Sequence, residues 1–204
     1  MGEPLKRNVG RLHLIVMMNI LFAILLLLST SISYQVDSMA LKERVAKTGS
    51  MLPTIPINAK LLVDEAYYAA KNPRRFDIVE VRRSFTNPGS SERSMDVVVR
   101  VIGLPGELIA LRRGSIYING RKIKEPFGVR QCPGKIDEMF PCGEMSAMKI
   151  PTGEYFMLTD NRAESGDSRL WSPRTIPKSA VLGKVIKVEL PSAAVQQALG
   201  ADSP

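Results

Sequence analysis

The feature that most constrains this chain is a continuous apolar run close to its start, at residues 14–33. Its centre, residues 20–28, contains no polar residue. A helix of about 20 apolar residues is long enough to span the hydrocarbon core of a bilayer. Lys6, Arg7 and Arg11 precede the run, and positive charge beside an apolar helix keeps that flank in the cytoplasm. The pattern therefore predicts one membrane helix that sends the rest of the chain to the other side.

This prediction divides the N-terminal region into a cytoplasmic segment at 1–12 and a single-pass anchor at 13–34 in the inner (plasma) membrane, with the following domain in the periplasm or outside the cell. The alternative is a cleaved signal peptide, since Ser38-Met39-Ala40 supplies the small residues of a cleavage site. The apolar run is longer than the core of a typical signal peptide, and this site lies well past its end, so an uncleaved anchor is favoured. Both interpretations export the domain that follows.

Cysteine content and charge fit an exported domain. Cys132 and Cys142 lie in one loop-like segment, where an oxidising compartment favours a disulfide over the alternative of two unpaired thiols. Two isolated cysteines without histidine partners do not complete a zinc site, so we expect no metal. The formal charge is +8, but the basic residues are scattered. Scattered charge favours an ordinary solvated surface over a site for an anionic partner, so we expect the lipid bilayer as a partner and no nucleic acid.

Beyond the anchor, short segments with strand character alternate with glycine, proline and asparagine. Asn119-Gly120 lies between two of them and is a strong hairpin signal. Residues 34–47 are either a connection or an edge strand, and helical periodicity recurs only near 65–71. The pattern predicts an all-β fold, an antiparallel barrel or sandwich. The expected strands are 60–63, 76–81, 96–102, 115–118, 121–123, 154–158 and 180–188.

The spacing of these segments also suggests how the exported part is organised. Residues 35–110 and 151–190 are expected to form the main β domain. Residues 111–150 are expected to form a small inserted β and loop subdomain, because the strand rhythm breaks there. Residues 191–204 form a small polar tail.

Three polar segments stand out as candidates for chemistry. Residues 48–54 place Ser50 in a turn between Gly49 and a proline, where a hydroxyl is held exposed. Residues 100–107 run from a strand into a Gly-Pro-Gly turn. Residues 159–169 contain two Asp, two Arg and two Ser in one loop, a density typical of a paired, hydrogen-bonded network.

Together these segments resemble the motifs of type I signal peptidases. The family's nucleophile motif reads Ser-Gly-Ser-Met-x-Pro-Thr, and residues 48–54 read Thr-Gly-Ser-Met-Leu-Pro-Thr. Its second motif reads Lys-Arg-Val-x-Gly-Leu-Pro-Gly-Asp, and residues 99–107 read Val-Arg-Val-Ile-Gly-Leu-Pro-Gly-Glu. Its third reads Gly-Asp-Asn-Arg-x-x-Ser-x-Asp-Ser-Arg, and residues 159–169 read Thr-Asp-Asn-Arg-Ala-Glu-Ser-Gly-Asp-Ser-Arg. The cysteine pair also lies where some bacterial members carry a disulfide.

The resemblance implies a membrane-bound serine endopeptidase that removes signal peptides from exported pre-proteins and needs no cofactor. Ser50 would be the nucleophile, the Thr48 hydroxyl would contribute to the oxyanion hole, and Ser165 would orient the base. Charge pairs would support the site through Arg100, Asp160, Asp167 and Arg169. A substrate with small residues at the first and third positions before the cut would bind as an added strand, along Ala46, Met51, Val97 and Val98.

One position departs from the family pattern. The family's general base is a lysine directly before the arginine of the second motif, and here that position is Val99. A serine hydroxyl is a weak nucleophile until a neighbouring group removes its proton. His13 lies at the cytoplasmic end of the predicted anchor, and Arg100 stays protonated. The remaining candidates for a base are Lys47, Lys60, Lys122 and Lys124.

Two functions therefore stay open after the sequence alone. The first is a working signal peptidase with an unidentified base. The second is a signal-peptidase-like pseudoenzyme that binds signal peptides without cleaving them. A third interpretation is a laboratory variant from which the lysine has been removed.

Overall fold

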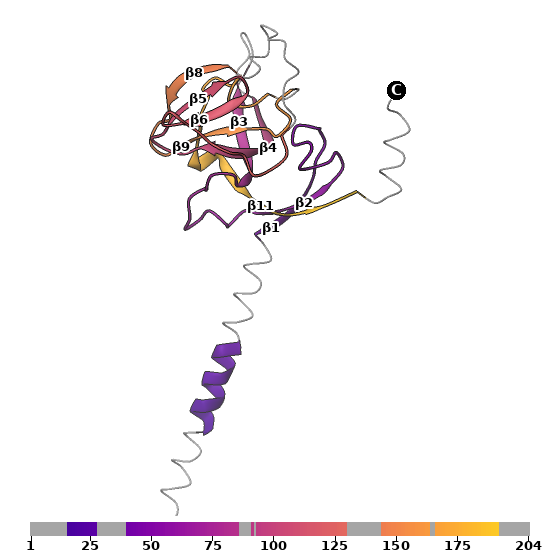
Figure 1. Cartoon of the computed structure of the whole chain (residues 1–204). Coiled ribbons are helices and arrows are strands. Elements are labelled where there is room, and N and C mark those ends of the chain that lie inside the picture. Colours follow the sequence, from indigo (N-terminus) through magenta and orange to yellow (C-terminus); the bar gives the residue numbers. More distant parts are fainter. Residues whose placement is uncertain are drawn as a thin grey trace, which may run out of the picture. The chain divides into compact units, whose positions relative to one another are not determined.

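The computed structural model describes residues 16–27, 40–85, 91, 93–129, 144–163 and 166–191. The chain separates into two compact units, Met1–Ala40 and Leu41–Pro204. In the first unit, residues 16–27 form a helix with exposed side chains (Figure 1). Within the part of the chain that the structure describes, no helix reaches the length and apolarity that a membrane span requires. The anchor predicted at 13–34 extends beyond these described residues at both ends.

The second unit is built on two antiparallel sheets, which confirms the predicted strand-rich, antiparallel class (Figure 1). The larger sheet has seven strands in the order β1-β2-β11-β3-β4-β9-β10. Its strands are β1 (Leu41–Val45), β2 (Lys60–Asp64), β3 (Ile78–Phe85), β4 (Arg93–Gly103), β9 (Glu154–Leu158), β10 (Ile176–Pro177) and β11 (Val181–Glu189). A short 3-10 helix, Lys178–Ala180, leads into β11.

The smaller sheet has four strands in the order β7-β6-β5-β8. They are β5 (Leu108–Arg112), β6 (Ser115–Ile118), β7 (Arg121–Lys122) and β8 (Met145–Lys149). Asn119 and Gly120 join β6 to β7 with positive φ values of 49° and 78°, as the predicted Asn-Gly hairpin requires. The limits proposed for an inserted subdomain at 111–150 stay a prediction.

The structure adds to the sequence predictions at 65–71, β5 and β8, and it decides one open alternative. Residues 65–71, where the sequence has helical periodicity, form turns and bends. Strand β5 was not expected, and β8 lies in the segment whose strand rhythm looked broken. Residues 41–45 form an edge strand, which decides between the two alternatives for 34–47.

Cross-strand pairing places alternate residues of β3 and β4 on opposite faces of the large sheet. One face packs Val79, Val81 and Val99 into an apolar core with strand β9. On the other face, Val98 packs against a second apolar cluster that includes Met51. The candidate site lies next to residues 46–51, where side chains from both faces of β4 line one pocket.

Candidate active site

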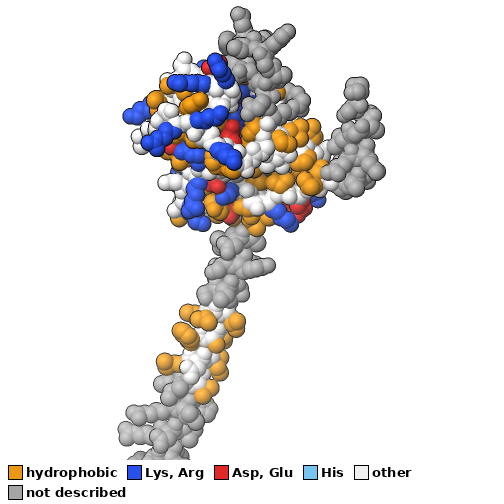
Figure 2. Space-filling model, viewed as in Figure 1, with side chains coloured by type: hydrophobic (Ala, Val, Ile, Leu, Met, Phe, Trp, Pro, Cys, Tyr) orange, Lys and Arg blue, Asp and Glu red, His pale blue; other side chains and the backbone are white. Residues whose placement is uncertain are grey.

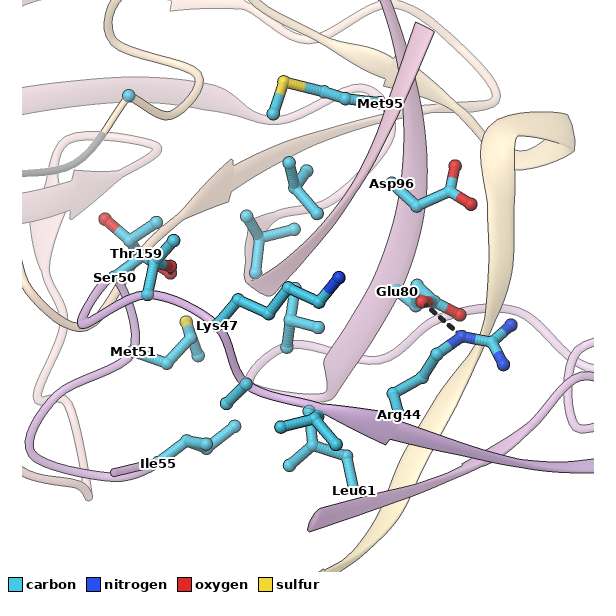
Figure 3. A pocket seen from close by; sticks show the side chains of 17 residues that line it. Arg44, Lys47, Ser50, Met51, Ile55, Leu61, Glu80, Met95, Asp96 and Thr159 are labelled. Atoms are coloured by element: carbon cyan, nitrogen blue, oxygen red, sulfur yellow. Dashed lines mark hydrogen bonds and ion pairs between the residues drawn. The ribbon is translucent and has the colours of Figure 1, made fainter. Parts of the chain in front are cut away.

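A pocket of about 420 Å³ brings the candidate nucleophile together with two distant segments of the chain. It is lined by Ser50 and its neighbours, by residues 95–99 of β4, and by Thr159 and Gly166 (Figure 3). The main-chain N–H of Asn161 donates a hydrogen bond to the Ser50 carbonyl at 3.0 Å. The polar loop at 159–169 is therefore fixed directly to the turn that carries the serine.

The Ser50 hydroxyl has one hydrogen-bonding side chain among the described residues. The Thr48 hydroxyl donates to Ser50 Oγ at 3.1 Å, and both hydroxyls are accessible from the pocket. The turn is held from the other side by Asn161, whose Nδ2 donates to the Gly49 carbonyl at 3.0 Å. Thr48 and Ser50 thus lie side by side, as two groups that act on one carbonyl must.

Val99 lies in the wall of this pocket and offers no titratable atom there. Its side chain is fully buried and belongs to the apolar core on the β9 side of the sheet. Among the four lysines that the sequence offered as a base, only Lys47 lines the pocket. Its side chain is exposed, and in Figure 3 it extends across the pocket away from Ser50.

Arg100, the residue after Val99, forms a buried ion pair with Asp160. Its Nε and Nη2 contact the two carboxylate oxygens of Asp160 at 2.9 and 2.6 Å, and Thr54 donates a further hydrogen bond to the same carboxylate. The Phe127 ring covers the guanidinium, with 3.7 Å between Arg100 Cζ and the ring centroid. These contacts tie β4, the loop after β9 and the segment after Ser50 into one rigid unit.

A second buried pair stabilises the far end of the polar loop. Asp167 accepts hydrogen bonds from Arg169 Nε and Nη2 at 2.8 and 2.9 Å and from the Thr159 hydroxyl at 3.0 Å. Asp167 is fully buried and Arg169 nearly so. Neither residue lines the pocket. The four charged residues expected to support the site therefore form two separate pairs.

The predicted substrate-binding residues Ala46, Met51, Val97 and Val98 all line the pocket. Ser165, Cys132 and Cys142 lie outside the described residues. Across the described ranges, no group of three His, Cys, Asp or Glu side chains is arranged to hold a metal.

The structure adds two pocket residues that the motifs did not single out, Arg44 and Glu80. Arg44 Nε donates to Glu80 Oε1 at 2.9 Å, and both side chains line the pocket (Figure 3). Glu80 interrupts an otherwise apolar strand centre, Ile-Val-Glu-Val, and is 4% exposed. A buried charge within a β-strand was the sequence signal for this part of the site.

The chain matches the family described as signal peptidase, peptidase S26, over residues 13–188, which is more than half of its length. The chain belongs to this family. Its members are serine endopeptidases that remove signal peptides. Over 167 residues it is 30% identical to signal peptidase I V of Bacillus subtilis strain 168, a match that covers 79% of this chain and 93% of that protein.

Two further proteins are similar to this chain. A probable signal peptidase I-2 from a Synechocystis strain is 29% identical over 145 residues, a match that covers 69% of this chain and 59% of that protein. The crystal structure of a signal peptidase I from Enterococcus faecalis V583 matches with a TM-score of 0.41 and 30% identity, covering 57% of this chain and 98% of that one.

Proposed function

We propose that this chain removes signal peptides from exported pre-proteins by attack of Ser50 on the scissile carbonyl. The observation that carries the proposal is the shared pocket of Ser50, Thr48 and the edge of β4. The Thr48 hydroxyl and the Ser50 main-chain N–H would stabilise the oxyanion. The N-terminal segment 13–34 would anchor the enzyme, with the β unit outside the cytoplasm.

The sheet topology supports binding of the substrate as an added strand. Strand β1 is an edge strand, and β9 pairs with β4 only at Arg100, Val101 and Gly103. On the side away from β3, the residues of β4 before Arg100 therefore have no partner strand among the described residues. Each neighbouring pair from β1 through β2, β11 and β3 to β4 is antiparallel, so β1 and β4 run in the same direction. An extended peptide in the pocket would pair with both edges, and its main chain would supply affinity for many sequences.

The general base is the finer part of the proposal. The resemblance places a lysine where this chain has Val99, and we propose that Lys47 takes the role. Its chain position, three residues before Ser50, lets the side chain turn toward the hydroxyl. In this role the amine would take the Ser50 proton as the hydroxyl attacks the scissile carbonyl.

A pseudoenzyme that binds signal peptides without cleaving them is the second candidate. It is favoured by the apolar surroundings of Val99 and by a Ser50 hydroxyl whose hydrogen-bonding partner, among described side chains, is another hydroxyl. In that case the strand-binding pocket would persist while proton transfer from Ser50 would not occur.

Cleavage of a pre-protein with an Ala-x-Ala site by the full chain in detergent micelles separates these candidates. We expect product from the parent, none from Ser50→Ala, and a large loss of kcat for Lys47→Met with little change in KM. Lys60→Met is the matched control, because Lys60 lies outside the pocket. Cleavage by the parent but equally by Lys47→Met would reject Lys47 as the base. No cleavage by the parent, with retained peptide binding, would establish the pseudoenzyme.

A further inference from the structure

A short segment at residues 125–128, which we call the strap, contacts all three sequence motifs of the site. It follows strand β7 and belongs to none of the motifs. Each contact joins one strap residue to one motif residue: Gly128 to Pro53 of the first motif, Phe127 to Arg100 of the second, and Glu125 to Arg162 of the third. No strap residue lines the Ser50 pocket. The strap therefore holds the site together from outside the pocket.

Two of these contacts are made to buried charges. Many basic side chains of the β unit lie at its surface, as Figure 2 shows. The side chains of Arg100 and Arg162 are only 7% and 3% exposed. The Phe127 ring covers the first guanidinium at 3.7 Å from Cζ, and the Glu125 carboxylate accepts a hydrogen bond from the second. A cation removed from water needs such partners, so the strap stabilises both charges where they lie.

The two buried arginines in turn bind the residues that precede Asn161. Arg162 Nε donates to the Thr159 carbonyl at 2.6 Å, and Arg100 pairs with the Asp160 carboxylate. Asn161 then binds the turn that carries the nucleophile, through its main-chain N–H and its side-chain amide. A shift of the strap would pass through both arginines to that turn.

Gly128 gives a shorter route to the same turn. Pro53 lies three residues after Ser50, and a Cβ atom added to Gly128 would lie 2.8 Å from Pro53 Cγ. A side chain at this position would force one of the two segments to move, so the close approach requires a glycine. The strap thus borders the nucleophile segment directly.

We propose that Phe127 is a positioning residue for Ser50, and that the strap sets the orientation of the nucleophile through Arg100 and Arg162. The inference rests on the proposed attack of Ser50 on the scissile carbonyl. A misplacement of about 1 Å far from the reacting atoms can lower a rate about 10²-fold. Because no strap residue lines the pocket, loss of a strap contact should lower kcat and leave KM near its parent value.

Cleavage of a pre-protein with an Ala-x-Ala site by the full-length chain in detergent micelles tests this role. Phe127→Leu keeps an apolar side chain and removes the ring, and we expect kcat to fall about tenfold with little change in KM. Phe127→Tyr keeps a ring over the guanidinium and should retain most of the activity. Tyr117→Leu is the matched control, because it removes a ring that lies 5.2 Å from Arg112 Cζ in the small sheet. Its kcat and KM should equal those of the parent.

Hydrogen–deuterium exchange adds a readout that needs no turnover. The amides of Leu52 and Asn161 donate to the Gly49 and Ser50 carbonyls. In Phe127→Leu these two amides should exchange faster than in the parent, because the turn opens locally more often. The amides of the small sheet should keep the parent's exchange rates.

Parent values of kcat and of these exchange rates in Phe127→Leu would overturn the proposal. An equal loss of kcat in Tyr117→Leu would also overturn it, since the effect would then be a general loss of stability. If Phe127→Leu does not fold, Glu125→Gln replaces it, because it removes the charge paired with Arg162 and should produce the same two effects. If the parent does not cleave, exchange decides alone. Faster exchange at Asn161 would then retain the role of the strap and reject only the proposed turnover, whereas unchanged exchange would reject both.

Discussion

Arg100 and Asp160 form a two-point ion pair next in the chain to residues of the Ser50 site, with Nε–Oδ1 and Nη2–Oδ2 distances of 2.9 and 2.6 Å. Their side chains are 7% and 0% exposed, so water does not solvate either charge. The pair joins Arg100 of β4 to Asp160 of the loop after β9. Val99, the residue before Arg100, lines the pocket, and Asn161, the residue after Asp160, binds the Ser50 turn. The position of the nucleophile thus depends on a contact between two residues that do not line the pocket.

Removal of one partner of this pair should destabilise the fold strongly. Asp160→Ala leaves the Arg100 charge buried without its carboxylate, and we expect the free energy of unfolding to fall by about 3–5 kcal/mol. The double variant Arg100→Met/Asp160→Leu removes both charges and should recover much of that loss. Urea unfolding of the parent and both variants measures the difference. Equal stability of Asp160→Ala and the parent would contradict the assigned role of the pair.

The hydrogen bond between Thr48 and Ser50 predicts an effect on rate with little effect on binding. Thr48→Val keeps the shape of the side chain and removes the hydroxyl, so kcat should fall by about 10²-fold while KM changes little. Thr48→Ser retains a hydroxyl and should keep most of the activity. A Thr48→Val enzyme with the parent's kcat would show that the oxyanion is stabilised without this group.

Val99→Lys should restore the amine that the resemblance places in the family's second motif. A lysine at this fully buried position loses hydration, which lowers its pKa and supplies a neutral base. If Lys47 is the base in the parent, the double variant Lys47→Met/Val99→Lys should regain activity that Lys47→Met lacks, by about 10²–10⁴-fold.

The control for this variant is Val99→Met, which fills similar space without an amine. The rate of Val99→Lys should rise with pH as the amine loses its proton, and a kcat–pH profile measures this. A gain of activity in Val99→Met would show that packing, and not proton transfer, limits the parent.

The sequence motifs singled out the pocket residues around Ser50 more fully than those around Glu80. Ser50, Thr48 and the two charge pairs belong to short motifs in which residue type, spacing and chain order carry the signal. The meeting of these motifs depends on β3, β4 and β9 pairing in one sheet, which the strand pattern only suggested. Arg44 and Glu80 were missed because they lie 36 residues apart and meet only through the β1-β2-β11-β3 order of strands.

The small sheet shows a second limit of the sequence patterns. The hairpin at Asn119-Gly120 was predicted because its turn chemistry is local. Strand β8 was not, since its residues, Met-Ser-Ala-Met-Lys, have little strand preference. Pairing with β5, more than 30 residues earlier, stabilises it instead.

A final prediction concerns the pH dependence of stability and rests on Asp77 and Lys184. Lys184 Nζ lies 2.7 Å from Asp77 Oδ1 in a partly buried pair. Burial alone would raise the pKa of Asp77, but hydrogen bonds from Lys184, the Arg74 N–H and the Tyr68 hydroxyl outweigh it and lower that pKa below 3.8. Burial likewise acts to lower the pKa of Lys184, and the contact with Asp77 outweighs it and raises that pKa above 10.5.

The sign of each shift fixes where stability is lost. A depressed carboxyl pKa stabilises the fold above pH 3.8, and that contribution disappears as the pH falls through the folded-state value. A raised lysine pKa stabilises the fold below pH 10.5, and that contribution disappears as the pH rises further. Asp77→Asn should therefore cost about 1 kcal/mol near neutral pH, after allowance for solvent screening, and progressively less below pH 4. Urea unfolding of parent and variant between pH 2.5 and about pH 8 measures the difference in stability. Asp96→Asn is an exposed control, and its cost in stability should be much smaller. A difference between parent and Asp77→Asn that stays constant across this range would rule out the charge of Asp77 as its cause.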